Sequence, residues 1–356
     1  MSDQYKWLLD ILAIISGLHT LVVIGGHLRK RFWRTDAGEK VRSRSDYALG
    51  SFLALLCGFL WSLSYVSLKY TSHRLHAIDI SAAVLGWAVF FLILARIVAL
   101  AIERRRGQGQ EPLPDWSNRK TALLALANIG NFGLSIYALY FISATQAMTL
   151  NNMSPLFLVA ILLFRRKLRP SAGTFSSIVI VLLGAWIMTV GRDFSVASTQ
   201  GMIGSLIAMG AGLSFAIWAD LIDDVEGEIR LLSTRFGFLA TIFFASFALA
   251  VTAAWLLAPT PPFSWLDGAI LAANGLRVAL VYVSFQLAVR FGGPLLAVVV
   301  AVSQVPLTLV WEAALLDLTI DSQIIIGVGA IVAGAVALLI DRTQAVPGTP
   351  APNPAA

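Results

Sequence analysis

The chain has 356 residues, of which 58% are hydrophobic and only 13% are charged, and its mean hydropathy is +0.78. A soluble protein of this length needs more charge than this on its surface, so the composition excludes the soluble globular class and predicts an integral membrane protein. The formal net charge of +6 follows from membrane topology, as argued below, and we infer no nucleic-acid partner from it.

Apolar segments long enough to cross a membrane recur along the whole chain. A helix needs about 20 apolar residues to cross the hydrocarbon core. Nothing in the sequence alternates between apolar and polar residues as membrane-barrel strands do, so each span is expected to be a helix. The eleven predicted spans are residues 7–26, 48–70, 79–102, 121–142, 144–164, 175–190, 201–222, 236–257, 265–287, 295–316 and 322–340.

The basic residues are distributed unequally between the two sides of the predicted membrane. Of the 26 Lys and Arg residues, twenty fall on one side, four on the other, and two, Arg96 and Arg277, within spans. Because basic loops are retained in the cytoplasm, we expect the amino terminus outside and the carboxy terminus in the cytoplasm.

The two ends of the chain lie outside the other ten spans. Residues 1–46 are predicted to form an extra transmembrane helix and a basic cytoplasmic linker. The basic cluster follows the apolar run instead of preceding it, which favours a retained helix over a cleaved secretory signal. Residues 343–356 are predicted to be a disordered cytoplasmic tail, since four of the last ten residues are proline.

Residues 47–200 and 201–342 resemble each other, which indicates an internal duplication. Each half would contain five helices, and because five is odd, the two halves would have opposite orientations in the membrane. The alternative is that apolar helices look alike by composition alone. The matching residues recur in the same order in both halves. Gly50 and Gly58 match Gly204 and Gly212, and Asn128, Gly130 and Tyr137 match Asn274, Gly275 and Tyr282. Further along, Pro155 matches Pro306 and Gly184 matches Gly334.

With these features the chain resembles the EamA-type members of the drug/metabolite transporter superfamily. The resemblance covers about Tyr47 to Arg342, and it is carried by the Trp61-Ser62 pair, the 137–139 run leading to Ser143-Ala144, the Asn152/Pro155 pair and the glycine-rich last helix of each repeat. It implies a ten-helix core of two inverted repeats that exports amino acids, related metabolites or drugs across the plasma (inner) membrane of bacteria. The chain departs from the family in its extra first helix, in Ser62 where Gly is frequent, and in Arg166 where Glu is frequent.

Arg277 is the most unusual polar residue within the predicted spans. It lies roughly 15 Å from either end of its helix at about 1.5 Å per residue, too deep for its head group to reach water easily along lipid. A polar cavity and a structural ion pair are both consistent with this position. Arg96, by contrast, lies near a helix end and is expected to extend its head group to the interface.

Polar residues at helical spacing form stripes on four of the predicted spans. Such stripes suit a hydrated central site, although polar residues also serve simply to hydrogen-bond neighbouring helices together. Trp61, Tyr137 and Tyr282 are aromatic residues that could wall such a site, and for the two tyrosines packing at the membrane interface is the alternative. The residues predicted to bind substrate are Arg277, Asn274, Asn128, Asn131, Gln304, Asn152, Tyr137, Tyr282 and Trp61.

Glu312 is the candidate for coupling protons to transport. A carboxyl group inside a membrane has a raised pKa and exchanges protons near ambient pH. The alternatives are a Glu312 side chain that faces the interface or one that pairs with Arg277.

Signatures of an enzyme are missing from the sequence. There is no phosphate-binding loop, no nucleophile elbow and no set of metal ligands with suitable spacing, so we expect no catalytic activity, no cofactor and no metal. The sequence therefore predicts a secondary active transporter, working by alternating access, of a small polar metabolite that is amino-acid-like or an organic anion. Its expected partners are that substrate and the lipid bilayer, with a homodimer left open. The alternative is a membrane sensor or scaffold that transports nothing.

Overall fold

The structure is a computed structural model that describes residues 44–72, 74–107, 111, 119–142, 144–165, 171–190, 199–226, 229–257, 264–316 and 322–344. All of them belong to one compact unit, Arg42–Ala356. The predicted first span, residues 7–26, and the predicted tail, residues 343–356 apart from its first two positions, lie outside the described residues.

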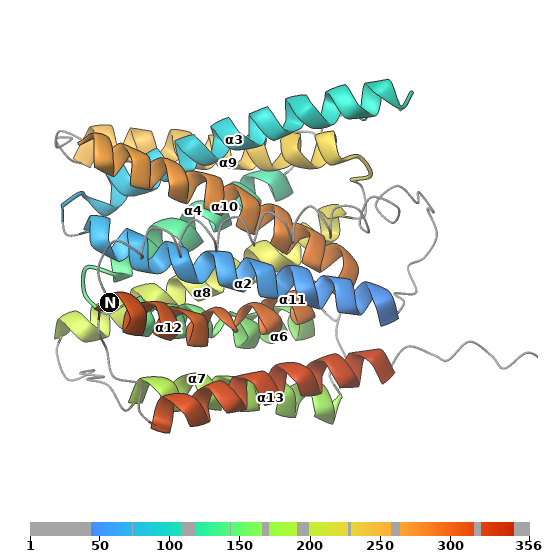
Figure 1. The fold of residues 1–356 in the computed structure, drawn as a ribbon. Coiled ribbons are helices and arrows are strands. Elements are labelled where there is room, and N and C mark those ends of the chain that lie inside the picture. Colours follow the sequence, from blue (N-terminus) through green and yellow to red (C-terminus); the bar gives the residue numbers. More distant parts are fainter. Residues whose placement is uncertain are drawn as a thin grey trace, which may run out of the picture. The chain divides into compact units, whose positions relative to one another are not determined.

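Every regular element of the described residues is a helix, which confirms the predicted all-helical fold class. Figure 1 shows these helices running lengthwise beside one another, with the beginning of α2 and the end of α13 at the same end of the unit. The elements are α2 (Arg44–Ser72), α3 (Ala77–Arg105), α4 (Arg119–Ala138), α5 (Ala144–Asn151), α6 (Ser154–Phe164), α7 (Ala172–Val190), α8 (Thr199–Glu226), α9 (Leu232–Leu257), α10 (Trp265–Gly292), α11 (Pro294–Ala301), α12 (Gln304–Leu316) and α13 (Ser322–Gln344).

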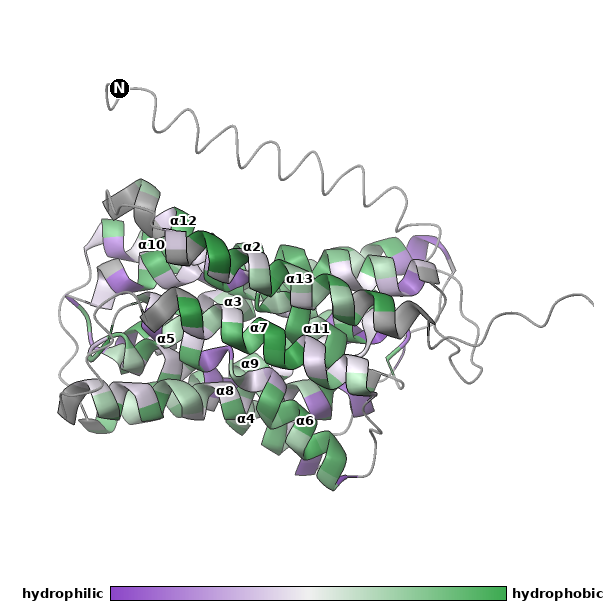
Figure 2. Cartoon of the chain, turned by 90° about the horizontal axis from the view of Figure 1, so that it is seen from below, coloured by the Kyte–Doolittle hydropathy of each residue, from purple (hydrophilic) through white to green (hydrophobic). Residues whose placement is uncertain are grey.

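The lengths and compositions of these helices are those of a membrane protein. Eight spans are long and apolar enough to cross a bilayer, and two shorter apolar helices, Ala172–Ile187 and Ile325–Leu338, lie within α7 and α13. Figure 2 shows apolar residues along the helix lengths and hydrophilic residues concentrated near the helix ends. Together these segments correspond to the ten spans predicted after residue 46.

Two predicted spans differ from the expectation of one continuous helix. Residues 144–164 are divided into α5 and α6, and residues 295–316 into α11 and α12. Pro155 and Pro306 explain both breaks, because proline lacks the N–H that would bond the carbonyl four residues earlier and its ring collides with that carbonyl. The chain instead makes tighter turns, in which the N–H groups of Met153 and Ser303 donate to the carbonyls of Leu150 (3.2 Å) and Val300 (3.1 Å).

The closest helix pairs each join one of the helices α2 to α7 to one of the helices α8 to α13. The most extensive contacts are those of α7 with α13, α3 with α9, α2 with α10, and α4 with α8. The hydrophobic core of the described helices therefore lies mainly between the two parts of the chain.

Two glycines allow straight helices to pack closely against the breaks. A β-carbon on Gly58 of α2 would lie 2.8 Å from Ser303 Oγ and 3.3 Å from the main-chain nitrogen of Gln304. A β-carbon on Gly212 of α8 would lie within 3.3 Å of three main-chain atoms of Asn151. The break between α11 and α12 therefore packs on α2, and the break between α5 and α6 packs on α8.

Candidate functional site

The first part of the site is a buried amide network beside the α5–α6 break. Asn131 of α4 donates its side-chain Nδ2 to the carbonyl of Ala211 (3.1 Å) and to Asn151 Oδ1 (3.4 Å). Asn151 in turn donates to the hydroxyl of Tyr65 (2.9 Å), and Tyr282 donates its hydroxyl to Asn131 Oδ1 (3.4 Å). Side chains from α2, α4, α5 and α10 thus converge on one point in the core.

The two helix breaks are joined by a second amide pair. Gln304, the first residue of α12, donates its side-chain Nε2 to Asn152 Oδ1 at 2.7 Å. Asn152 lies in the turn between α5 and α6 and also donates to the carbonyl of Met148 (2.7 Å). Within the described part of the chain, Gln304 Oε1 is buried and accepts no hydrogen bond. A buried acceptor without a donor is costly, so this oxygen is available to a hydrogen-bond donor that enters the site.

Aromatic side chains enclose the amide network. The ring of Tyr282 lies 5.6 Å from that of Trp61, 4.9 Å from that of Trp218 and 4.8 Å from that of Phe243. Phe215 contacts Trp61 edge-on at 5.4 Å. These separations are typical of favourable aromatic pairs, which make the wall of the site rigid and specific in shape.

Arg277 lies in a separate polar cluster between α2 and α10. Its Nη1 donates to Ser67 Oγ (3.2 Å) and to Asn274 Oδ1 (3.3 Å), and Ser67 Oγ also donates to Asn274 Oδ1 (2.9 Å). No carboxylate of the described side chains forms a salt bridge with Arg277. The remaining N–H groups of its guanidinium are therefore not neutralised by an acidic side chain described here.

The remaining predicted residues lie apart from these clusters. Asn128 is buried between α4 and α9, where it donates to Ser246 Oγ at 3.0 Å. Tyr137 is not brought into the site, because its side chain is 47% exposed and contacts Tyr140 and Phe141 instead. Glu312 belongs to α12, and its side chain lies outside the described residues.

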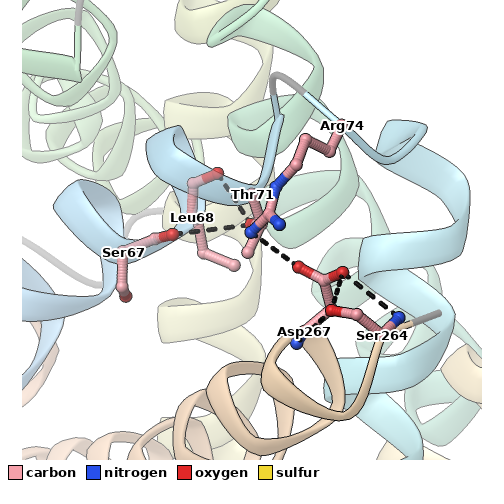
Figure 3. Close-up of polar contacts among 6 residues, drawn as sticks. All are labelled: Ser67, Leu68, Thr71, Arg74, Ser264 and Asp267. Carbon is pink, nitrogen blue, oxygen red and sulfur yellow. Dashed lines mark hydrogen bonds and ion pairs between the residues drawn. The ribbon is translucent and has the colours of Figure 1, made fainter.

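One end of the α2–α10 interface is closed by an ion pair, shown in Figure 3. Arg74 Nη2 lies 2.7 Å from Asp267 Oδ1. Asp267 also accepts hydrogen bonds from the main-chain nitrogen and the hydroxyl of Ser264, while its own N–H donates to Ser264 Oγ. This reciprocal capping box fixes the start of α10 and so holds Asp267 toward Arg74.

Four residues of these polar and aromatic clusters were not predicted from the sequence: Tyr65, Asn151, Ser67 and Phe215. Two of them carried a detectable signal. Tyr65 follows Trp61 by four residues and Phe215 precedes Trp218 by three, so each pair shares a helix face. Ser67 and Asn151 are ordinary polar residues on their helices, and only the packing of other helices against them reveals their roles.

The described side chains include no group of three or more His, Cys, Asp or Glu residues that could hold a metal ion. The polar groups of the two clusters are amides, hydroxyls and, beside Ser67 and Asn274, one guanidinium. Such groups bind by hydrogen bonding and charge, and no described nucleophile–base pair accompanies them.

The fold and this site define a multi-pass helical membrane protein with two broken helices meeting at its centre. Residues 48–190 match the EamA-like transporter family model, which confirms the predicted family resemblance over that part of the chain. A solved structure described only as a crystal structure of a protein is similar to this chain with a TM-score of 0.65 and 16% sequence identity, covering 85% of this chain and 99% of that one. That likeness shows a shared fold. No curated protein matches the sequence.

Proposed function

We propose that this protein is a secondary active transporter that exports a small polar metabolite, amino-acid-like or an organic anion, by alternating access. In this proposal residues 47–200 and 201–342 form two inverted repeats of five helices in the plasma (inner) membrane. The amino terminus is outside and the carboxy terminus is cytoplasmic, as the distribution of Lys and Arg predicts.

The observation that carries the proposal is the meeting of the two broken helices at the Asn152–Gln304 hydrogen bond. Discontinuous helices at a repeat interface are a common way to build a transport site, because irregular backbone is tolerated at membrane depth only where protein or a polar cavity surrounds it. The amide network and its aromatic wall lie beside this crossing and can bind a polar solute without a fixed charge of their own.

Arg277 is proposed to give the site its preference for negative charge. A guanidinium can hold a carboxylate by two parallel hydrogen bonds, and no described acidic side chain competes for it. Ser67 and Asn274 hold the side chain through Nη1, which leaves its other donors for a substrate.

The first test identifies the substrate. Metabolites that accumulate in cells lacking the gene, but not in cells expressing it, are compared without preselection. Candidates are then measured as labelled solutes taken up by inside-out vesicles that contain the purified protein. A chain that moves none of them, although it is folded and correctly inserted, would instead support the sensor or scaffold alternative.

The second test concerns Arg277. Arg277→Lys keeps the charge but loses the planar fork and should weaken transport, while Arg277→Ala should abolish transport of an anionic or zwitterionic substrate. Arg119→Gln removes an exposed charge and serves as the matched control. Normal transport by well-folded Arg277→Ala protein would contradict the role, and a lowered melting temperature in both Arg277 variants would show that the residue is structural.

A further inference from the structure

The half-helix α6 is fixed to α8 at both of its ends. It begins at the break, where Gly212 of α8 packs against Asn151. It ends next to Arg165, whose guanidinium contacts Asp220 and lies 3.0 Å from Asp224, both on α8. Because the order of these contacts along both helices is the same, α6 and α8 run parallel from the centre toward the end where α8 ends.

The half-helix α12 is fixed to α2 in the corresponding way, but by different chemistry. It begins at the break, where Gly58 of α2 packs against Gln304. Further along, Trp311 Nε1 donates to Ser62 Oγ at 3.1 Å, and its ring meets Phe59 edge-on at 5.9 Å. The helices α12 and α2 therefore run parallel from the centre toward the end where α2 ends.

These two half-helices point to opposite ends of the unit, as the contacts of α4 show. Lys120, at the beginning of α4, lies 3.8 Å from Asp224. Tyr140, just after the end of α4, donates its hydroxyl to the carbonyl of Leu75, just after the end of α2. The helix α4 therefore runs from the end of the unit where Arg165 lies to the end where α2 stops. Because α6 leads to the first end and α12 to the second, the two half-helices point in opposite directions.

The network at the Arg165 end is held by charge. Asp220 is only 3% exposed, whereas the Arg165 side chain is 35% exposed. The hydrogen bonds to Asp224 and Asp220 raise the pKa of Arg165 above its ordinary value, so the guanidinium stays charged. Removing Arg165 would leave the Asp220 carboxylate buried without this partner, which is much more costly than losing an exposed pair.

We propose that the Arg165–Asp220–Asp224 network is the gate at the cytoplasmic end and that the Trp311–Ser62 contact is the gate at the outer end. The proposal rests on the proposed transport function, because only an alternating-access cycle needs both. In the structure both contacts are formed. Opening to the cytoplasm then requires ion pairs to break, whereas opening to the outside requires an indole hydrogen bond and ring packing to break.

Cys57 provides a reporter that needs no substrate. It is the only cysteine of the chain, it is fully buried in α2, and it precedes Trp61 by four residues on the same helix face. Its rate of modification by a membrane-impermeant methanethiosulfonate is measured separately in inside-out and right-side-out vesicles. In the wild-type protein the rate should be low from both faces.

Arg165→Gln and Asp220→Asn should each raise the rate from the Arg165 face by about tenfold or more and leave the rate from the other face unchanged. A tenfold change corresponds to about 1.4 kcal/mol removed from the closed state. Trp311→Phe, which keeps a ring but loses the N–H donor, should raise the rate from the opposite face only. Arg119→Gln removes a positive charge from the Arg165 end without touching the described network, and should change neither rate.

Arg165→Lys separates gating from misfolding. It retains the charge and should bring the rate from the Arg165 face back toward that of the wild type, while a misfolded protein would react faster from both faces. The gate is refuted if Cys57 reacts at the wild-type rate in Arg165→Gln and Asp220→Asn, or if its rate rises equally from both faces. Solute uptake tests the transport function separately from Cys57 modification. If the protein is not a transporter, uptake is absent, whereas if the gate lies elsewhere, uptake is present and the Cys57 rates do not respond to the variants.

Discussion

The main-chain carbonyl oxygen of Asn151 lies 2.5 Å from the position that a β-carbon on Gly212 would occupy. Asn151 is the last residue of α5, and the residue four positions later is Pro155, which has no N–H to donate to this carbonyl. Only a glycine on α8 leaves room for the broken helix, and its Cα–H group lies against the oxygen that the break releases. Gly58 likewise faces the break in the other helix: a β-carbon there would lie 3.2 Å from the carbonyl oxygen of Ala301.

Gly212→Ala should therefore destabilise the protein by about 1–3 kcal/mol, the range expected for overpacking a close contact. Gly133→Ala is the matched control, because a β-carbon on Gly133 of α4 would meet nothing within 4 Å. That control should be neutral or slightly stabilising, since alanine is the better helix former. Free energies of unfolding in detergent measure both effects, and equal stability of the two variants would contradict the predicted contact.

Tyr282 should contribute to stability through its ring much more than through its hydroxyl. The hydroxyl bond to Asn131 is long at 3.4 Å, whereas the ring packs against Trp61, Trp218 and Phe243. We expect Tyr282→Phe to cost at most about 1 kcal/mol and Tyr282→Ala about 3–5 kcal/mol. Unfolding in detergent compares them, and a Phe variant as unstable as the Ala variant would show that the hydroxyl is the important group.

Asp267 and Arg74 should contribute unequally although they form one ion pair. Arg74 is 42% exposed on its side chain, so Arg74→Gln should cost no more than about 1 kcal/mol. Asp267 also forms half of the α10 capping box, so Asp267→Ala should cost about 1 kcal/mol more than Arg74→Gln. Melting curves of the single variants and of the double variant test this, and equal losses from the two single variants would argue against a capping contribution.

The proposed topology places His76 outside and Gly107 in the cytoplasm. Both residues are exposed, so in a Cys57→Ser background a cysteine at either position should react readily. In intact cells an impermeant maleimide should label His76→Cys and leave Gly107→Cys unlabelled until the membrane is opened. Thr71, although in the same part of the chain as His76, is fully buried and unsuitable for this purpose. Labelling of Gly107→Cys but not His76→Cys would reverse the orientation.

The spans and the family resemblance could be predicted from the sequence because both depend on local patterns of apolar residues, glycine and proline. The contacts of the site could not, since they join distant positions. Tyr65 and Asn151, for example, are 86 residues apart and neither is unusual in its own helix. Prolines within two spans were visible, but whether a span bends or divides depends on which neighbouring helix can approach the freed carbonyl.

Tyr137 shows why symmetry in sequence misled the site prediction. It was matched with Tyr282, yet Tyr137 is 47% exposed and Tyr282 only 1%. The helix α4 has 20 residues and ends one residue after Tyr137, whereas α10 has 28 residues and continues ten residues beyond Tyr282. Two positions that correspond in sequence therefore lie at different depths along their helices.

The pairing of helices α2 to α7 with helices α8 to α13 also bears on how the protein is made. Its closest contacts, such as α2 with α10 and α4 with α8, cannot form until the later helix has been synthesised. At about 5–20 residues per second, the five described spans between residues 44 and 190 would wait roughly 8–30 s in the membrane for their partners. During that interval buried polar residues such as Asn131 and Asn151 would face lipid or one another, which makes the half-synthesised chain a natural target for membrane chaperones and proteases.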